Sequence, residues 1–152
     1  MTGPAAHHAP TALDPRAEAR RHRVELRSAI QAFEAALAVP AGDPTWRKRV
    51  GDRLRDLREA FAEHVTVTEG ADGLYAQLLD DTPRLACAVR SLVDEHGALA
   101  GAIQTLCADA TAGEIERLRE RGVDLLRGLA RHRQRGADLV YEAYATDIGG
   151  ET

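Results

Sequence analysis

Four segments of this chain place mainly apolar residues at steps of three or four positions. In an α-helix this spacing puts the apolar side chains on one face, which must be buried against other helices. The four stripes are His22, Leu26, Ile30, Phe33 and Leu37; Val50, Leu54, Leu57, Phe61, His64 and Thr68; Leu85, Val89, Leu92, His96, Leu99, Ile103 and Leu106; and Leu118, Gly122, Leu125, Leu129, His132, Gly136, Leu139 and Ala143. No segment shows the sustained two-residue alternation of a half-buried strand, so the sequence predicts an all-α fold.

Aspartate and proline residues mark where the first three helices begin. Asp14-Pro15 and Asp43-Pro44 each offer an N-cap side chain followed by proline in the first helical turn, and Asp81-Thr82-Pro83 repeats the signal. These helices are expected to end near positions 37, 67 and 107. Thr111 to Glu114 has the form of a capping box, which predicts a fourth helix running past Tyr144.

The connections between these segments are short, which favours antiparallel neighbours. The chain is therefore predicted to form an antiparallel up-down-up-down four-helix bundle over residues 14–148. A short amphipathic piece is expected over residues 74–79, after the second helix. Residues 1–13, which include His7 and His8, are expected to be a flexible N-terminal tail.

Composition narrows the class of protein. A chain of 152 residues with 44% hydrophobic residues suits one globular domain, and no window approaches the roughly 18 apolar residues of a membrane span. The net charge of −4 gives no reason to expect a nucleic-acid or membrane partner. With no leader segment recognised, a cytoplasmic protein is expected. Cys87 and Cys107 lack a CxxC pattern and are expected to be buried small residues rather than disulfide partners or zinc ligands.

Each of the four stripes carries one histidine: His22, His64, His96 and His132. A single inward histidine is usually a core residue whose ring is hydrogen-bonded to a neighbour. Four imidazoles that converge in an apolar core would be costly to bury, because their ring nitrogens all need partners. A metal ion supplies such a partner directly. The pattern therefore favours a metal site in the bundle core.

These histidines and their spacing resemble the hemerythrin-like (HHE cation-binding) family. The intervals of 42, 32 and 36 residues along the series from His22 to His132 are similar to that family's spacing, and Asp94-Glu95-His96 resembles its frequent Glu-His pair. The resemblance covers about residues 15–145. It implies a four-helix bundle that holds non-haem iron, with the four histidines as terminal ligands.

The sequence departs from the family at the two bridging carboxylates, which the family places four residues after the second and fourth histidines. Here those positions are Thr68 and Gly136, so neither glutamate is present. A variant aspartate five residues after the fourth histidine is missing too, because that residue is Ala137. Fewer carboxylates offset less positive charge, so a mononuclear or altered di-iron site is expected. Glu69 is the expected carboxylate ligand, because a π-bulge before Gly70 would turn it onto the histidine face.

The resemblance implies that the iron handles a small ligand, namely dioxygen, peroxide or nitric oxide. If the protein is an enzyme, a non-haem iron oxidoreductase is implied. Two alternatives stay open: a degenerate, metal-free helical module for interaction or dimerisation, and a bundle that binds haem between facing histidines. The apolar C-terminal stretch at 138–144 is expected to cover the end of the bundle, or else to meet a second copy in a homodimer.

Overall fold

The structure is a computed structural model that describes residues 14–145. Its elements are α1 (Pro15–Ala38), α2 (Trp46–Glu69), α3 (Leu74–Asp81), the 3-10 helix η1 (Pro83–Leu85), α4 (Ala86–Ala112) and α5 (Ile115–Ala145). No strand occurs among these residues, which confirms the predicted all-α class. The predicted tail, with His7 and His8, and residues 146–148 of the predicted domain lie outside the described residues.

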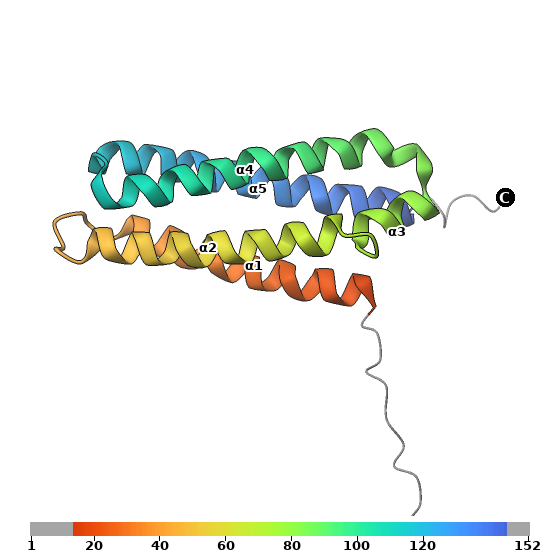
Figure 1. The fold of residues 1–152 in the computed structure, drawn as a ribbon, viewed down its shortest axis with the longest axis horizontal. Helices are drawn as coiled ribbons and strands as arrows, with labels where there is room; N and C mark the ends of the chain where they lie inside the picture. The colour runs from red at the N-terminus through yellow and green to blue at the C-terminus, as the bar shows by residue number, and fades with distance from the viewer. Residues whose placement is uncertain (1–13, 146–152) are drawn as a thin grey trace, which may run out of the picture.

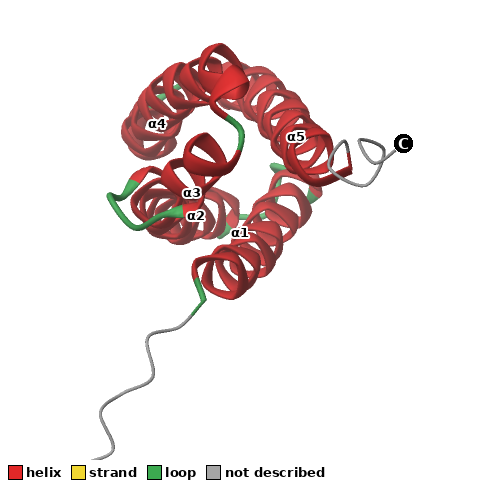
Figure 2. Cartoon of the chain, turned by 90° about the vertical axis from the view of Figure 1, so that its right-hand side faces the viewer, coloured by secondary structure: helices red, strands yellow, loops and turns green. Residues whose placement is uncertain are grey.

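The four long helices lie side by side, and the connections between them alternate between the two ends of the molecule (Figure 1). The turns after α1 and α4 lie at one end, whereas α3 and η1 lie at the other. Viewed along the long axis, α1, α2, α4 and α5 surround a common centre, with α3 across the near end (Figure 2). This arrangement is compatible with the expected antiparallel bundle. No helix in the described part of the chain combines the length and the apolar content that a membrane crossing requires.

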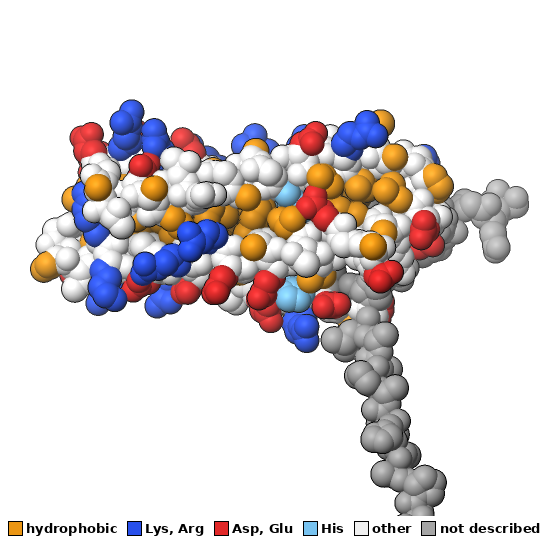
Figure 3. Space-filling view, in the orientation of Figure 1, with side chains coloured by type: hydrophobic (Ala, Val, Ile, Leu, Met, Phe, Trp, Pro, Cys, Tyr) orange, Lys and Arg blue, Asp and Glu red, His pale blue; other side chains and the backbone are white. Residues whose placement is uncertain are grey.

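The apolar core is divided into two clusters along the bundle. The larger contains Phe33, Trp46 and Leu129, and the smaller contains Leu78 and Leu139. On α5 the residue between the two clusters is a histidine, and the same is true of α4, so a polar layer interrupts the core. The face in Figure 3 shows apolar side chains along the groove between α2 and α4, with a histidine visible among them.

The helix ends differ from the predicted ones where local signals were ambiguous. The predicted capping box does not form, because α4 continues through Thr111 and ends at Ala112, and only Gly113 and Glu114 separate it from α5. The Thr111 hydroxyl instead donates back to the carbonyl of Ala108 within α4. The Asp43 carboxylate accepts hydrogen bonds from Thr45, and α2 begins at the next residue.

The prediction that both cysteines are buried is wrong. Cys87 is exposed and Cys107 is only partly buried. Cys87 lies in the first turn of α4, off the apolar stripe that carries Leu85 and Val89, so helical rotation turns its thiol outward.

Gly73 is expected to be intolerant of a side chain. A Cβ at this position would collide with the backbone carbonyl of Val67 and lie 3.0 Å from the carbonyl of Thr68, where α2 turns into α3. Because backbone atoms cannot move aside cheaply, Gly73→Ala should lower the free energy of unfolding by about 1–3 kcal/mol. Urea denaturation measures this. Gly42→Ala is the matched control, since nothing lies within 4 Å of its Cβ; an equal loss in both variants would contradict the steric explanation.

Candidate metal centre

Three of the four predicted histidines meet in the core. His64 on α2, His96 on α4 and His132 on α5 offer ligand atoms that all lie within 4.8 Å of one another. Their ring centroids are 5.1 Å apart for His64 and His96, 4.7 Å for His96 and His132, and 5.9 Å for His64 and His132. The three residues are 7%, 2% and 4% exposed. Helical periodicity brings them here, because each continues the buried stripe of its own helix.

The buried ring nitrogens of two of these histidines have no hydrogen-bond partner. Both nitrogens of His64 and both nitrogens of His96 are inaccessible and unpaired within the described residues. Leaving a buried polar group unsatisfied costs about 1–3 kcal/mol, so such groups are rare in a stable core. An ion that accepts a lone pair from each imidazole would satisfy one nitrogen of each ring.

His132 is oriented by a carboxylate. Its Nδ1 lies 2.7 Å from Oε2 of Glu95, and Glu95 also accepts a hydrogen bond from Arg135. Burial raises the pKa of the Glu95 carboxyl, but the hydrogen bonds from His132 and Arg135 outweigh it and lower that pKa below its ordinary value. Because an ionised carboxylate can only accept, Nδ1 of His132 carries the proton and Nε2 keeps its lone pair free.

Glu95 was missed as a partner of His132 by the sequence analysis, which noted it only within the Glu-His pair. The two residues are on different helices and 37 positions apart. No local spacing signals such a contact, because it depends on how α4 and α5 are rotated against each other.

Glu69, the predicted carboxylate ligand, lies beside the histidine group rather than in it. Its Oε1 is 3.6 Å from Nδ1 of His96, and its carboxyl is not among the ligand atoms that converge within 4.8 Å. The expected π-bulge is absent from α2, which stays α-helical through Glu69. Burial raises the pKa of the Glu69 carboxyl. The Glu69 carboxylate thus lies near His96 without a hydrogen bond to it, whereas Glu95 is hydrogen-bonded to His132.

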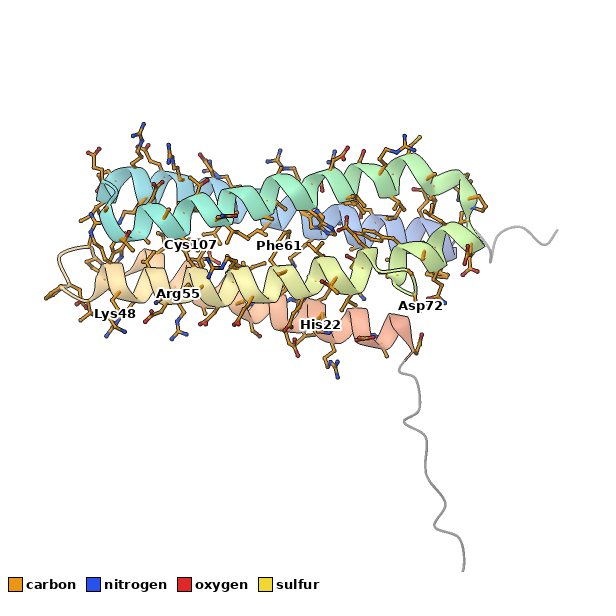
Figure 4. All side chains as sticks on the ribbon, viewed as in Figure 1. His22, Lys48, Arg55, Phe61, Asp72 and Cys107 are labelled. Carbon is orange, nitrogen blue, oxygen red and sulfur yellow. The ribbon has the colours of Figure 1, made fainter. Side chains whose placement is uncertain are left out.

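His22 does not join the group. Its Nδ1 faces two carboxylates, at 3.4 Å from Glu25 and 3.5 Å from Glu63, in a separate and more exposed cluster. Figure 4 shows His22 on α1, whereas Phe61 points from α2 into the space between the helices. The predicted convergence thus holds for three imidazoles and not for the fourth, because α1 is rotated so that His22 meets the edge of α2.

Two aromatic rings pack against the histidine group. Phe61 contacts all three imidazoles, with centroid distances of 5.9 Å to His64, 5.7 Å to His96 and 6.3 Å to His132. Tyr75 of α3 stacks on His96 at 5.8 Å with an interplanar angle of 14°. Burial raises the pKa of the Tyr75 hydroxyl, which therefore stays protonated. These rings keep bulk water from much of the site.

Burial also keeps two of the imidazoles neutral. Desolvation, together with the nearby His132, lowers the pKa of His64 to about 4 and that of His96 to about 3. Neutral imidazole is the form that binds metals. A first-row metal bonded at about 2.1 Å to each ring holds its ligand atoms no more than roughly 4.2 Å apart, so modest side-chain rotation adapts this group to one ion. The residues therefore fit a single transition-metal ion.

A cavity of about 500 Å³ reaches the histidines from the side. His64 and His132 line it, together with residues of α1 and α5. A metal ion held by three protein ligands keeps coordination positions for a further ligand. The arrangement can accordingly bind an ion and leave it open to a small molecule.

Replacing Glu95 by glutamine should weaken metal binding without abolishing it. The amide keeps the side chain's volume but no longer holds the proton on Nδ1 of His132 with a charge, and losing such a partner typically costs 10–100-fold in affinity. Competition with a calibrated chelator measures the change. Asp94→Asn on the same helix is the control, since Asp94 is exposed. If the two variants bind equally well, Glu95 has no orienting role.

Comparisons of the chain with protein-family models, with curated proteins and with solved structures give no match. The candidate centre therefore rests on its own geometry.

Proposed function

We propose that the protein is a non-haem metal protein in which His64, His96 and His132 bind one transition-metal ion inside an up-down-up-down four-helix bundle. Imidazole is a good ligand for iron, zinc, copper and nickel. We propose iron, in line with the hemerythrin-like resemblance of the histidine spacing. The mononuclear form is proposed because the group offers three imidazoles and, among the described residues, no converging carboxylate.

The observation that carries this proposal is the set of unpaired, buried nitrogens on His64 and His96. A metal-free module would have no reason to keep these polar atoms in a layer between two apolar clusters, where leucine would be more stable. The hydrogen bond between His132 and Glu95 adds support, because a histidine that ligates a metal commonly donates its second ring nitrogen to a carboxylate.

The bound ion would supply open coordination positions for dioxygen, peroxide or nitric oxide. The chain itself contributes the rest: Phe61 and Tyr75 exclude water, and Glu95 holds the proton on Nδ1 of His132. Tyr75 is protonated and lines the cavity, so its hydroxyl is a source of one hydrogen bond near the ligand. We propose a cytoplasmic protein that binds such a ligand, with oxidoreductase activity as its enzymatic form.

Elemental analysis and an absorption spectrum of untagged protein, expressed with ample iron, test the proposal. About one equivalent of iron per chain with no Soret band is the expected result. About two equivalents would contradict the mononuclear form. A Soret band would identify haem instead, and protein that stays metal-free after incubation with iron(II), zinc(II) and cobalt(II) would exclude the centre altogether.

A further inference from the structure

The cavity beside the histidines lies where the bundle is least tightly closed. Its walls come mainly from α1 and α5, and these two helices contact each other far less than the other neighbouring pairs of long helices do. The open seam leaves a path from the surface to His64 and His132.

Four guanidinium groups line this cavity: those of Arg20, Arg23 and Arg27 on α1 and Arg133 on α5. Within the described residues none of the four takes part in an ion pair or hydrogen bond, whereas other arginines such as Arg53 and Arg121 are paired with aspartates. No aspartate or glutamate of the described residues lines the cavity. The described lining of the cavity therefore carries four positive charges and no carboxylate.

Arg23 is the least exposed of the four arginines, since it is partly buried and the others are exposed. Its positive charge acts to lower the pKa of both His64 and Tyr75. Desolvation and the positive charge of Arg20 lower the pKa of Arg23. A positive charge that is partly buried and has a second cation nearby is costly, and an anion beside Arg23 would offset that cost.

Small side chains leave room for such an anion. Thr68 and Gly136 follow His64 and His132 by four residues, one helical turn on, and both line the cavity. A Cβ at Gly136 would meet nothing within 4 Å. At these two positions a carboxylate of the chain would face the histidines, and neither residue provides one.

The other walls are apolar. Val24, Leu74 and Val140 line the cavity along with Ala130 and Ala137. A volume of about 500 Å³ is far larger than a diatomic molecule or a single inorganic ion needs. The cavity thus offers charge for one end of a ligand and apolar surface for the remainder.

We propose that this cavity binds a small organic carboxylate, with its carboxylate group between Arg23 and Arg133 beside the histidines and its apolar body against the valine and leucine walls. Arginine suits this role because its planar fork binds a carboxylate through two parallel hydrogen bonds. The inference goes beyond the metal centre, since the guanidinium groups attract a carboxylate whether or not an ion is bound.

Benzoate is the probe, and benzamide is its neutral counterpart of the same shape. Isothermal titration of the full-length protein, both metal-loaded and chelator-treated, should show benzoate binding in each form and benzamide at least about tenfold more weakly. Arg23→Gln and Arg133→Gln should each raise the benzoate Kd by roughly tenfold or more. Arg23→Lys keeps the positive charge but cannot form two parallel hydrogen bonds to a carboxylate. Its benzoate Kd should lie between those of the unmodified protein and Arg23→Gln.

Arg21→Gln and Arg131→Gln are the matched controls, because these exposed arginines lie on the same two helices and do not line the cavity. They should change the Kd by less than about twofold. Equal affinity for benzamide, equal effects of the control variants, or no benzoate binding would each overturn the proposal and leave the metal centre standing. Benzoate binding seen only with metal and unchanged in Arg23→Gln would also overturn it. Arginine-dependent binding in protein that takes up no metal would support this inference and reject the centre.

Discussion

Protein carrying His96→Leu is expected to be purified without metal. Leucine has a similar volume and suits a 2%-exposed position, so the variant should fold while losing one of three ligands. The same result is expected for His64→Leu and His132→Leu. With two imidazoles left, affinity should fall by more than the 10–100-fold that loss of an orienting carboxylate typically costs. Elemental analysis of each purified variant, with circular dichroism to confirm folding, measures the effect.

His22→Leu is the informative control for this series. His22 occupies the corresponding stripe of α1, yet its ring faces Glu25 and Glu63 and not the other histidines. The variant should therefore retain its metal. Metal loss in His22→Leu would show that four histidines form the site, as the sequence alone predicted, and retention of metal in all three core variants would disprove the centre.

Acidification should strongly destabilise the metal-free protein. The pKa values of His64 and His96 are lowered to about 4 and about 3 by burial, against 6.5 in an unfolded chain. Below pH 6.5 the unfolded chain binds a proton at each of these two histidines, whereas the folded core leaves them unprotonated. The free energy of unfolding therefore keeps its full value above pH 6.5 and falls as the pH drops toward 4. Each ring contributes about 1.4 kcal/mol per pH unit, which gives a loss of about 4 kcal/mol between pH 7 and pH 5.

Most of the charged groups around His64 and His96 also lower the pKa values of these two rings. His132, once it is protonated, and the guanidinium group of Arg23 both disfavour the protonation of His64 further. The raised pKa of Glu69 acts in the opposite sense and offsets a small part of the loss. Urea denaturation at pH 7 and pH 5 in the presence of a chelator measures the difference. The double variant His64→Leu/His96→Leu should lose most of this pH dependence, and an unchanged midpoint in the unmodified protein would contradict neutral buried histidines.

Much of the helical framework can be predicted because its signals are local. Steps of three and four residues fix which face of a segment is apolar, and this places His64, His96 and His132 on buried stripes regardless of the partner helix. Segment ends were predicted less well. Thr111 satisfies its hydroxyl within α4, so a pattern typical of a helix start lies inside a helix.

The sequence by itself determined the all-α class and the inward position of three histidines, since both follow from periodicity along single helices. Only the tertiary structure decided which rings meet. His22 lies on an apolar stripe yet turns to Glu63 of the neighbouring helix, and Glu95 binds a ring on α5. The height and rotation of one helix against another are set by side-chain packing over the whole interface, which is not encoded in the spacing of any one segment. The arginine-lined cavity arises in the same way, from a seam that α1 and α5 leave open.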